Sequence, residues 1–183
     1  MTAPAGDGSP DIARLVAVRL RDVPDFPQPG IVFKDITPLL ADGAAFSAAI
    51  HALAGLARAS GPVELVCGIE ARGFIVAAAL AGALECGVVP MRKAGKLPPP
   101  TLHRAYALEY GTAEIEVPTN VLDGKRVYLV DDVLATGGTL AAALDLIRLA
   151  GGSLTGVGVL IELGFLNGRG RLPEVPLNAL LRV

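Results

Sequence analysis

Residues 127–139 read Val-Tyr-Leu-Val-Asp-Asp-Val-Leu-Ala-Thr-Gly-Gly-Thr, and this stretch decides the fold of the chain. The four apolar residues at its start, 127–130, predict a strand that is buried on both faces. An acidic pair and a turn of small residues follow the strand directly. A helix is predicted behind the turn, because Leu140, Leu144 and Ile147 recur on one helix face. The stretch therefore predicts a strand, a glycine turn and a helix in immediate succession.

This succession makes a site for an anion at the turn. Backbone N–H groups of the turn and of the helix N-terminus converge there, and glycine lets the backbone approach a ligand closely. The carboxylates before the turn, Asp131 and Asp132, accept hydrogen bonds when ionised and suit the vicinal hydroxyls of a ribose. Alternatively, these aspartates cap the helix and the glycines form an ordinary tight turn. The candidate phosphate-binding residues are Ala135, Thr136, Gly137, Gly138 and Thr139.

Composition restricts the class of protein. The chain has 183 residues, enough for one domain with a sizeable core, and 52% of them are hydrophobic. The mean hydropathy of +0.53 does not indicate a membrane protein, because the longest apolar run, 74–84, is far shorter than the roughly 20 residues of a spanning helix. A net charge of −2 argues against broad nucleic-acid binding. Two cysteines, Cys67 and Cys86, and a polar N-terminus without a visible signal peptide favour the reducing cytoplasm.

Alternating strands and helices along the chain predict an α/β fold with a mainly parallel central sheet flanked by helices. Residues 1–8 are expected to be disordered, and residues 9–183 to form a single domain. Ser9 and Pro10 predict the start of a first helix, as N-cap and first helical residue. Ligands of such sheets bind beyond the carboxyl ends of the strands, where the acidic pair falls. Further helices are expected at about 43–59 and 75–84, and further strands at 63–69, 88–91, 114–117 and 154–163.

The whole stretch 127–139 resembles the signature of the type I phosphoribosyltransferases that binds phosphoribosyl pyrophosphate (PRPP). The resemblance continues through three other motifs in family order and runs from about Phe26 to Leu163. It implies the type I phosphoribosyltransferase fold with a flexible catalytic lid. It also implies that Asp131 and Asp132 bind the ribose and that the glycine turn binds the 5′-phosphate.

A second turn, 68–74, reads Gly-Ile-Glu-Ala-Arg-Gly-Phe between a predicted strand and a predicted helix. It predicts another anion site on the same edge of the sheet, in which Arg72 can hold a phosphate through two parallel hydrogen bonds. Taken alone, an arginine beside a turn is as often a plain surface residue. In the family this loop holds the pyrophosphate of PRPP, and the resemblance places a cis peptide bond near Glu70-Ala71.

Three cations follow within a short run, at Arg92, Lys93 and Lys96. Such a run is usually a solvated charge cluster, but this one lies at a strand end before a long loop. A leaving pyrophosphate develops dense negative charge, which cations and Mg²⁺ would stabilise. The resemblance assigns Lys93 to the pyrophosphate, with Arg92 and Lys96 as further candidates, one of which could reach a neighbouring subunit.

The segment 97–113 shows no steady periodicity and is expected to be a long loop that covers the site. It resembles the catalytic lid of the adenine phosphoribosyltransferases, including the Leu-Glu-Tyr-Gly core at 108–111. The resemblance implies that Glu109 handles the purine proton and that Tyr110 supports the closed lid. A closed lid would keep water from an oxocarbenium-like ribosyl centre. The prolines at 98–100 depart from the commoner Leu-Pro-Gly arrangement of the family.

The segment 26–39 resembles the base-binding motif of the same family and reads Phe-Pro-Gln-Pro-Gly-Ile-Val-Phe-Lys-Asp-Ile-Thr-Pro-Leu. Its Pro-Gly pair at 29–30 predicts a type II turn, and Phe33 could stack on a flat heterocycle or be a core aromatic. Backbone groups can pair with the N6 donor and the N1 acceptor of adenine, whereas a 6-oxopurine reverses this pattern. The family binds adenine through the backbone around Val32 and Lys34, with Phe33 as the stacking face.

Together these motifs identify the chain as a member of the adenine phosphoribosyltransferases, which convert adenine and PRPP into AMP and pyrophosphate in purine salvage. The resemblance implies Mg²⁺ bound mainly through PRPP and pyrophosphate, no metal site of the protein's own, and a homodimer. Two alternatives stay open: a transferase of the same fold for another purine base, and a non-catalytic nucleotide-sensing regulator. His51 and His103 lack a partner spacing for metal binding or nucleophilic catalysis and are assigned no role.

Overall fold

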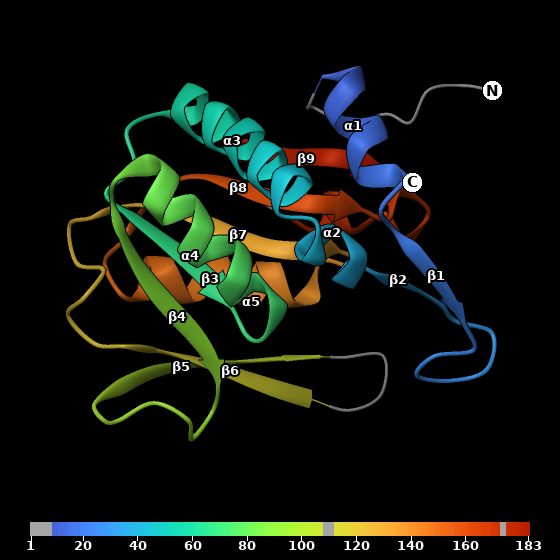
Figure 1. The fold of residues 1–183 in the computed structure, drawn as a ribbon. Coiled ribbons are helices and arrows are strands. Elements are labelled where there is room, and N and C mark those ends of the chain that lie inside the picture. Colours follow the sequence, from blue (N-terminus) through green and yellow to red (C-terminus); the bar gives the residue numbers. More distant parts are fainter. Residues whose placement is uncertain (1–8, 108–111, 173–174) are drawn as a thin grey trace.

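Seven strands form the central sheet of the protein (Figure 1). The structure is a computed structural model that describes residues 9–107, 112–172 and 175–183. In spatial order the strands are β5 (Thr101–Ala107), β6 (Thr112–Pro118), β4 (Gly87–Lys93), β3 (Leu65–Ile69), β7 (Arg126–Leu134), β8 (Ser153–Glu162) and β9 (Leu177–Arg182). Neighbours in the series β4, β3, β7, β8 and β9 are parallel, whereas the pairs β6–β4 and β5–β6 are antiparallel. The sheet is mainly parallel, as the sequence predicts.

Helices cover both faces of this sheet (Figure 1). The helices are α1 (Pro10–Ala17), α2 (Thr37–Ala41), α3 (Gly43–Ser60), α4 (Arg72–Leu84) and α5 (Gly138–Leu149), with the short 3-10 helices η1 (Gly164–Leu166) and η2 (Gly168–Arg171). The first cluster of buried apolar side chains packs α1, α3 and α4 on one face, and the second packs α5 on the other. Strand β7 runs between the two clusters, which explains why its residues 127–130 are all apolar and fully buried.

Local signals in the sequence set the ends of several elements. Ser9 caps α1, because its hydroxyl accepts a hydrogen bond from the N–H of Ile12 at 3.4 Å. Gly30 has a φ of +86°, and the N–H of Ile31 donates to the carbonyl of Gln28 at 3.2 Å, which confirms the type II turn. Within the described ranges, no helix combines the length and the hydropathy that crossing a bilayer requires.

The stretch 97–113, expected to be a long loop, instead contains strand β5 and the start of β6. The two strands pair residue by residue as an antiparallel hairpin that extends the sheet beyond β4. The expectation is wrong here because cross-strand pairing stabilises β5, whose own apolar residues alternate too weakly to reveal a strand.

A separate two-stranded sheet carries the segment that resembles a base-binding motif. Strands β1 (Arg21–Pro24) and β2 (Val32–Asp35) are antiparallel and lie beside α2, outside the central sheet (Figure 1). The sequence predicts the turn between them but not this pairing, because Arg-Asp-Val-Pro at 21–24 lacks the alternating apolar residues that would mark a strand.

Candidate active site

The two aspartates lie where β7 extends past its neighbour β3. Strand β3 pairs with β7 only as far as Val130, whereas β8 stays paired with β7 through Leu134. Asp131 and Asp132 therefore belong to the strand, and do not follow it as the sequence suggests, because pairing with β8 continues through them. The edge of β7 toward β3 is open beyond Val130, and both aspartates line a cavity there.

Asp131 is a half-buried carboxylate beside the buried carboxylate of Asp132. Burial, and then the charge of Asp132, raise the pKa of Asp131 well above its usual value. The N–H of Asp132 donates to Oδ1 of Asp131 at 2.9 Å, which opposes this rise. Oδ2 of Asp132 is buried and lies 2.5 Å from Nε of Arg72, but this ion pair is not aligned as a hydrogen bond, and Oδ2 has no hydrogen-bond partner among the described residues. The pair can accept hydrogen bonds from a ligand with two hydroxyl groups.

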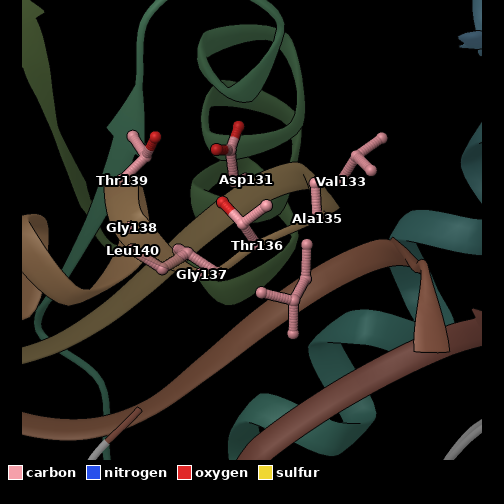
Figure 2. Close-up of a pocket in the computed structure, with 9 residues that line it drawn as sticks. Asp131, Val133, Ala135, Thr136, Gly137, Gly138, Thr139 and Leu140 are labelled. Carbon is pink, nitrogen blue, oxygen red and sulfur yellow. The ribbon is translucent and has the colours of Figure 1, made fainter. Parts of the chain in front are cut away.

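The residues 135–139, predicted to bind a phosphate, line a cavity of about 70 Å³, and we call them the phosphate turn. Figure 2 shows the hydroxyl of Thr136 on the side of the turn that faces Asp131 and Thr139. In the described structure, Gly137 is the N-cap of α5, with a φ of +84°, and no side chain caps this helix. The alternative in which the aspartates are N-caps is therefore wrong. The first N–H groups of α5 have no acceptors within the helix, and the residues that carry them line this cavity.

A close backbone contact holds the phosphate turn from behind. A Cβ on Gly137 would lie 2.5 Å from the carbonyl oxygen of Gly168 in η2, and a Cβ on Gly168 would collide with the carbonyl of Ala135. Next to this contact, Nη2 of Arg169 lies 2.6 Å from Oε2 of the buried Glu162. Packing thus requires glycine at both positions, and at Gly137 the positive φ requires it as well. Local motifs do not reveal this contact, because its partners are distant in the sequence.

The turn between β3 and α4 lies at the same end of the sheet. The peptide bond between Glu70 and Ala71 is cis, as the resemblance implies. Arg72 begins α4, and its guanidinium pairs with Asp132 and lies over the ring of Phe33, with Cζ 4.7 Å from the ring centroid. Arg72 therefore contacts both Asp132, which is predicted to bind the ribose, and Phe33, whose ring is predicted to stack on the base.

Three groups converge on the carboxylate of Glu70. Nζ of Lys96 donates to Oε1 at 2.7 Å, while Nε of Arg92 and the backbone N–H of Lys93 donate to Oε2 at 3.3 Å and 3.0 Å. These hydrogen bonds, that of Lys96 first, lower the pKa of Glu70 to about 2. Glu70 lines a cavity of about 560 Å³, the large cavity of the site, whereas Arg92, Lys93 and Lys96 are not part of its lining. We call Glu70, Arg92 and Lys96 the cation wall.

Strand β2 presents the candidate adenine-binding residues. Val32 is 49% exposed, and Phe33 meets the ring of Phe26 edge-on with the centroids 5.2 Å apart. Nζ of Lys34 donates to Asp22 at 2.7 Å, which directs this side chain away from a ligand role. In the described part of the chain, β1 is the only sheet partner of β2. The other backbone edge of β2 is therefore free of strand pairing and able to bind the edge of a flat base.

The large cavity of about 560 Å³ is lined by strand β2, by the turn between β3 and α4, and by the aspartates of β7. Its wall also includes Tyr106 of β5, Leu163 and Leu166, which the sequence did not single out. No motif marks these three, since they are ordinary side chains that only the fold brings to the site. The sequence-predicted residues on this wall are Val32, Phe33, Lys34, Arg72, Asp131, Asp132, Ala135 and Thr139.

Glu109 and Tyr110, the candidate acid/base and lid residues, lie outside the described residues. The last described pair of the hairpin before them is Ala107 with Thr112. Tyr106 lines the large cavity, so the described end of the hairpin reaches the cavity wall.

Fold and site together define a phosphoribosyltransferase, and comparison with known proteins agrees. Residues 35–174 match the phosphoribosyl transferase domain family, and the chain belongs to it. The chain is 56% identical to the adenine phosphoribosyltransferase of Thermobifida fusca over 96% of this chain and 99% of that protein. It is 59% identical to that of Acidothermus cellulolyticus over 94% and 98%. Within the family, the chain thus falls among the adenine phosphoribosyltransferases, enzymes that transfer the 5-phosphoribosyl group of PRPP to adenine.

Solved structures show the same similarity. The adenine phosphoribosyltransferase of Rhodothermus marinus has a TM-score of 0.89 and 46% identity, covering 94% of this chain and 99% of that one. The enzyme of Saccharomyces cerevisiae, complexed with adenine and an imino-altritol bisphosphate, has a TM-score of 0.87 and 35% identity, covering 93% and 99%. The whole described architecture is therefore that of this family.

Proposed function

We propose that this chain joins adenine and PRPP within the cavity of about 560 Å³ and releases AMP and pyrophosphate. The observation that carries the proposal is that this one cavity is bounded by the edge of β2, the ribose aspartates and the turn at Glu70. A transferase must hold both substrates side by side, and holding them in register removes much of the entropic barrier. The names of the relatives and the adenine bound in the yeast structure support adenine as the acceptor.

The groups of PRPP would be held by separate parts of the site. The phosphate turn binds the 5′-phosphate through backbone N–H groups and the hydroxyls of Thr136 and Thr139. Asp131 and Asp132 bind the ribose hydroxyls as ionised acceptors, and are not the catalytic acids. Arg72 binds the pyrophosphate, and the charges that assist it are Arg92, Lys93 and Lys96.

Adenine would enter beside Phe33 and pair with the backbone of Val32 and Lys34. A planar base between Phe33 and Arg72 needs roughly 7 Å, twice a van der Waals contact, but the guanidinium carbon lies 4.7 Å from the ring centroid. Arg72 must therefore move off this ring before the base can stack there. A PRPP pyrophosphate gives Arg72 a new partner and frees Asp132 for the ribose.

Glu109 would act as the general acid/base for the purine proton, with Tyr110 supporting the closed lid. The transfer itself is a dissociative displacement at the anomeric carbon, in which positioning and charge stabilisation supply most of the rate. The described end of the hairpin supports this proposal, because Tyr106 of β5, next to the last described pair Ala107 and Thr112, lines the cavity.

Magnesium is part of the proposal. Among the described residues, no group of three His, Cys, Asp or Glu side chains could hold a metal ion by itself. We therefore propose that Mg²⁺ is held mainly by oxygens of PRPP and pyrophosphate, with Asp131 and Asp132 as the carboxylates of the chain that suit such a hard cation. When bound, the ion would neutralise the charge of the leaving pyrophosphate.

We further propose a homodimer that acts in the cytoplasm. Apolar side chains of α4 and β4 are exposed, with Ile75 46% and Val88 48% accessible, and an interface would cover such groups. Cys67 and Cys86 are both free thiols, as suits a reducing compartment. Light scattering during gel filtration measures the oligomeric state directly.

One assay tests the proposed function. Adenine, PRPP and Mg²⁺ are mixed with the protein, and AMP formation is followed by ultraviolet absorbance and chromatography, with hypoxanthine and guanine as competing acceptors. We expect AMP from adenine and little product from the 6-oxopurines, because these would leave buried groups of the β2 edge unpaired. Preferred turnover of hypoxanthine or guanine would favour a transferase for another base, and no turnover at all would favour a nucleotide-sensing regulator.

The Glu109→Leu variant tests the acid/base assignment. We expect kcat to fall by roughly 10²- to 10⁴-fold while PRPP still binds, since the change removes the proton-transfer group and leaves the phosphate sites intact. An unchanged kcat would remove Glu109 from the chemistry.

A further inference from the structure

Glu116 is a buried carboxylate that the proposed reaction does not use. It lies on β6, is 1% exposed and is absent from the wall of the large cavity. Burying a carboxylate is unfavourable unless donors satisfy it. Its neighbour two residues earlier on the same strand, Glu114, faces solvent with 47% of its side chain accessible. The two glutamates therefore differ in environment, and the burial of Glu116 calls for a structural reason.

The donors of Glu116 come from the segment that carries the cations. Its Oε1 accepts the backbone N–H groups of Lys96 and Leu97, both at 2.7 Å. Its Oε2 accepts the hydroxyl of Thr101 on β5 at 3.2 Å, and Nδ1 of His103 lies 3.8 Å away. Burial opposes ionisation, but these hydrogen bonds outweigh it and lower the pKa of Glu116. One carboxylate thus fastens the segment after β4 to both strands of the hairpin.

The fastened segment in turn shapes the cation wall. The carbonyl oxygen of Lys96 accepts a hydrogen bond from Nη1 of Arg92 at 3.1 Å, and Nζ of Lys96 reaches Glu70 at 2.7 Å. Arg92 also lies opposite Glu116 in the register of β4 and β6. A chain of direct contacts therefore runs from Glu116 through the backbone of Lys96 to Glu70 on the cavity wall.

We infer that Glu116 is a positioning residue for the pyrophosphate half of the site: it holds the backbone at Lys96 and Leu97 so that Lys96 and Arg92 meet the pyrophosphate group. The inference rests on the proposed function. Because AMP carries no pyrophosphate, disturbing Glu116 should weaken the binding of PRPP and of pyrophosphate and leave the binding of AMP unchanged.

The test compares Glu116→Gln and Glu116→Ala with the matched control Glu114→Gln. Steady-state kinetics are measured in both directions, which gives KM values for PRPP, pyrophosphate and AMP and both kcat values. For Glu116→Ala we expect the KM of PRPP and of pyrophosphate to rise about 10-fold while the KM of AMP stays within about 2-fold. Glu116→Gln keeps the volume and a neutral acceptor, so it should show a smaller shift of the same kind. Glu114→Gln should match the wild type.

A second arm asks whether Glu116 acts through Lys96 and Arg92. In a background that carries both Lys96→Ala and Arg92→Ala, adding Glu116→Gln should change the KM of pyrophosphate by less than about 2-fold, because both side chains that it positions are already gone. Fully additive effects would overturn the inference, as would an equal rise in the KM of AMP. If Glu116→Ala does not fold, Glu116→Gln alone decides, since the same pattern of KM values supports or overturns the inference.

The experiments can overturn the proposed function and the role of Glu116 separately. A wild type that forms no AMP from adenine and PRPP overturns the proposed function, and the inference falls with it. An active wild type whose Glu116 variants keep the pyrophosphate KM overturns the inference alone.

Discussion

Two regions of the site, the phosphate turn and the cation wall, are built in opposite ways for the phosphoryl groups that we propose they bind. The phosphate turn, 135–139, offers backbone N–H groups that glycine packing holds in place. The cation wall offers charged side chains held by hydrogen bonds of 2.7–3.3 Å to Glu70. Backbone dipoles fixed by packing cannot adjust, whereas ionic side chains can exchange one anionic partner for another. The difference suits a reaction in which the 5′-phosphate stays bound and the pyrophosphate leaves.

The largest expected effect comes from filling the phosphate turn. Gly137→Val places a β-branched residue at a φ of +84° and its Cβ 2.5 Å from the carbonyl oxygen of Gly168. We expect the KM values of PRPP and AMP to rise by roughly 100-fold or more, since strain and clash both displace the turn. Steady-state kinetics in both directions measure this change.

The matched control is Gly82→Ala on α4, where nothing lies within 4 Å of an added Cβ. It should leave every KM unchanged and keep or slightly raise the melting temperature, because alanine favours a helix. A normal PRPP KM in Gly137→Val would contradict the assignment of the 5′-phosphate to this turn.

Salt concentration should affect ligand binding at the cation wall more strongly than at the phosphate turn. Lys96 is 47% exposed and Arg92 34% exposed, so dissolved ions can screen the cation wall. Between about 0.05 and 0.5 M salt we expect the KM of pyrophosphate to rise about 10-fold and that of AMP less than about 3-fold. The same reverse-reaction assay provides both values. An equal salt effect on the two ligands would remove the proposed difference between the two regions.

Asp131 lines both cavities, and we expect its ionised carboxylate to destabilise the folded protein. The pKa of Asp131 is raised, so its ionisation is disfavoured in the folded state. The ionised carboxylate therefore destabilises the folded wild type at a pH above that raised pKa. This destabilisation disappears as the pH falls toward the ordinary pKa near 3.8. We expect Asp131→Asn to melt a few degrees higher at pH 7, with the gain shrinking toward pH 4, and to bind PRPP more weakly. Thermal denaturation across this pH range tests the sign. A lower melting temperature at pH 7 would show that Asp131 does not destabilise the free protein.

The smallest effect concerns the stability that the cation wall adds. The pKa of Glu70 is lowered from 4.5 to about 2, so its ion pairs stabilise the fold above about pH 4.5, and this contribution is lost as pH falls through about 2. We expect Glu70→Gln to melt a few degrees lower at pH 7 and the gap to narrow below pH 4.5. Melting curves of Glu70→Gln and of the exposed Glu114→Gln, recorded in parallel, provide the comparison. A gap that stays constant down to pH 3 would argue against an ionic origin.

The order of elements around the phosphate turn could be predicted because its signals are local. The apolar run 127–130, the glycines and the helix spacing after them act over a few residues, and the structure bears out each element. The same holds for the cap at Ser9 and for the turn at Gly30. Strand β6 could be predicted at 114–117 from its own alternation, and the structure confirms it. Strand β5 and its pairing with β6 could not be predicted, because β5 is stabilised by its partner strand and not by its own pattern.

The sequence by itself determined which chemistry the chain carries: the acidic pair, the two anion-binding turns and the motif of 26–39 are contiguous, and their residue types decide what they can bind. Only the tertiary structure decided how these parts meet. It placed Gly168 against Gly137, Glu70 against Lys96 and Arg72 over Phe33. Such contacts join residues far apart in the chain, so they depend on which strands become neighbours in the sheet, and no local pattern of residues specifies that.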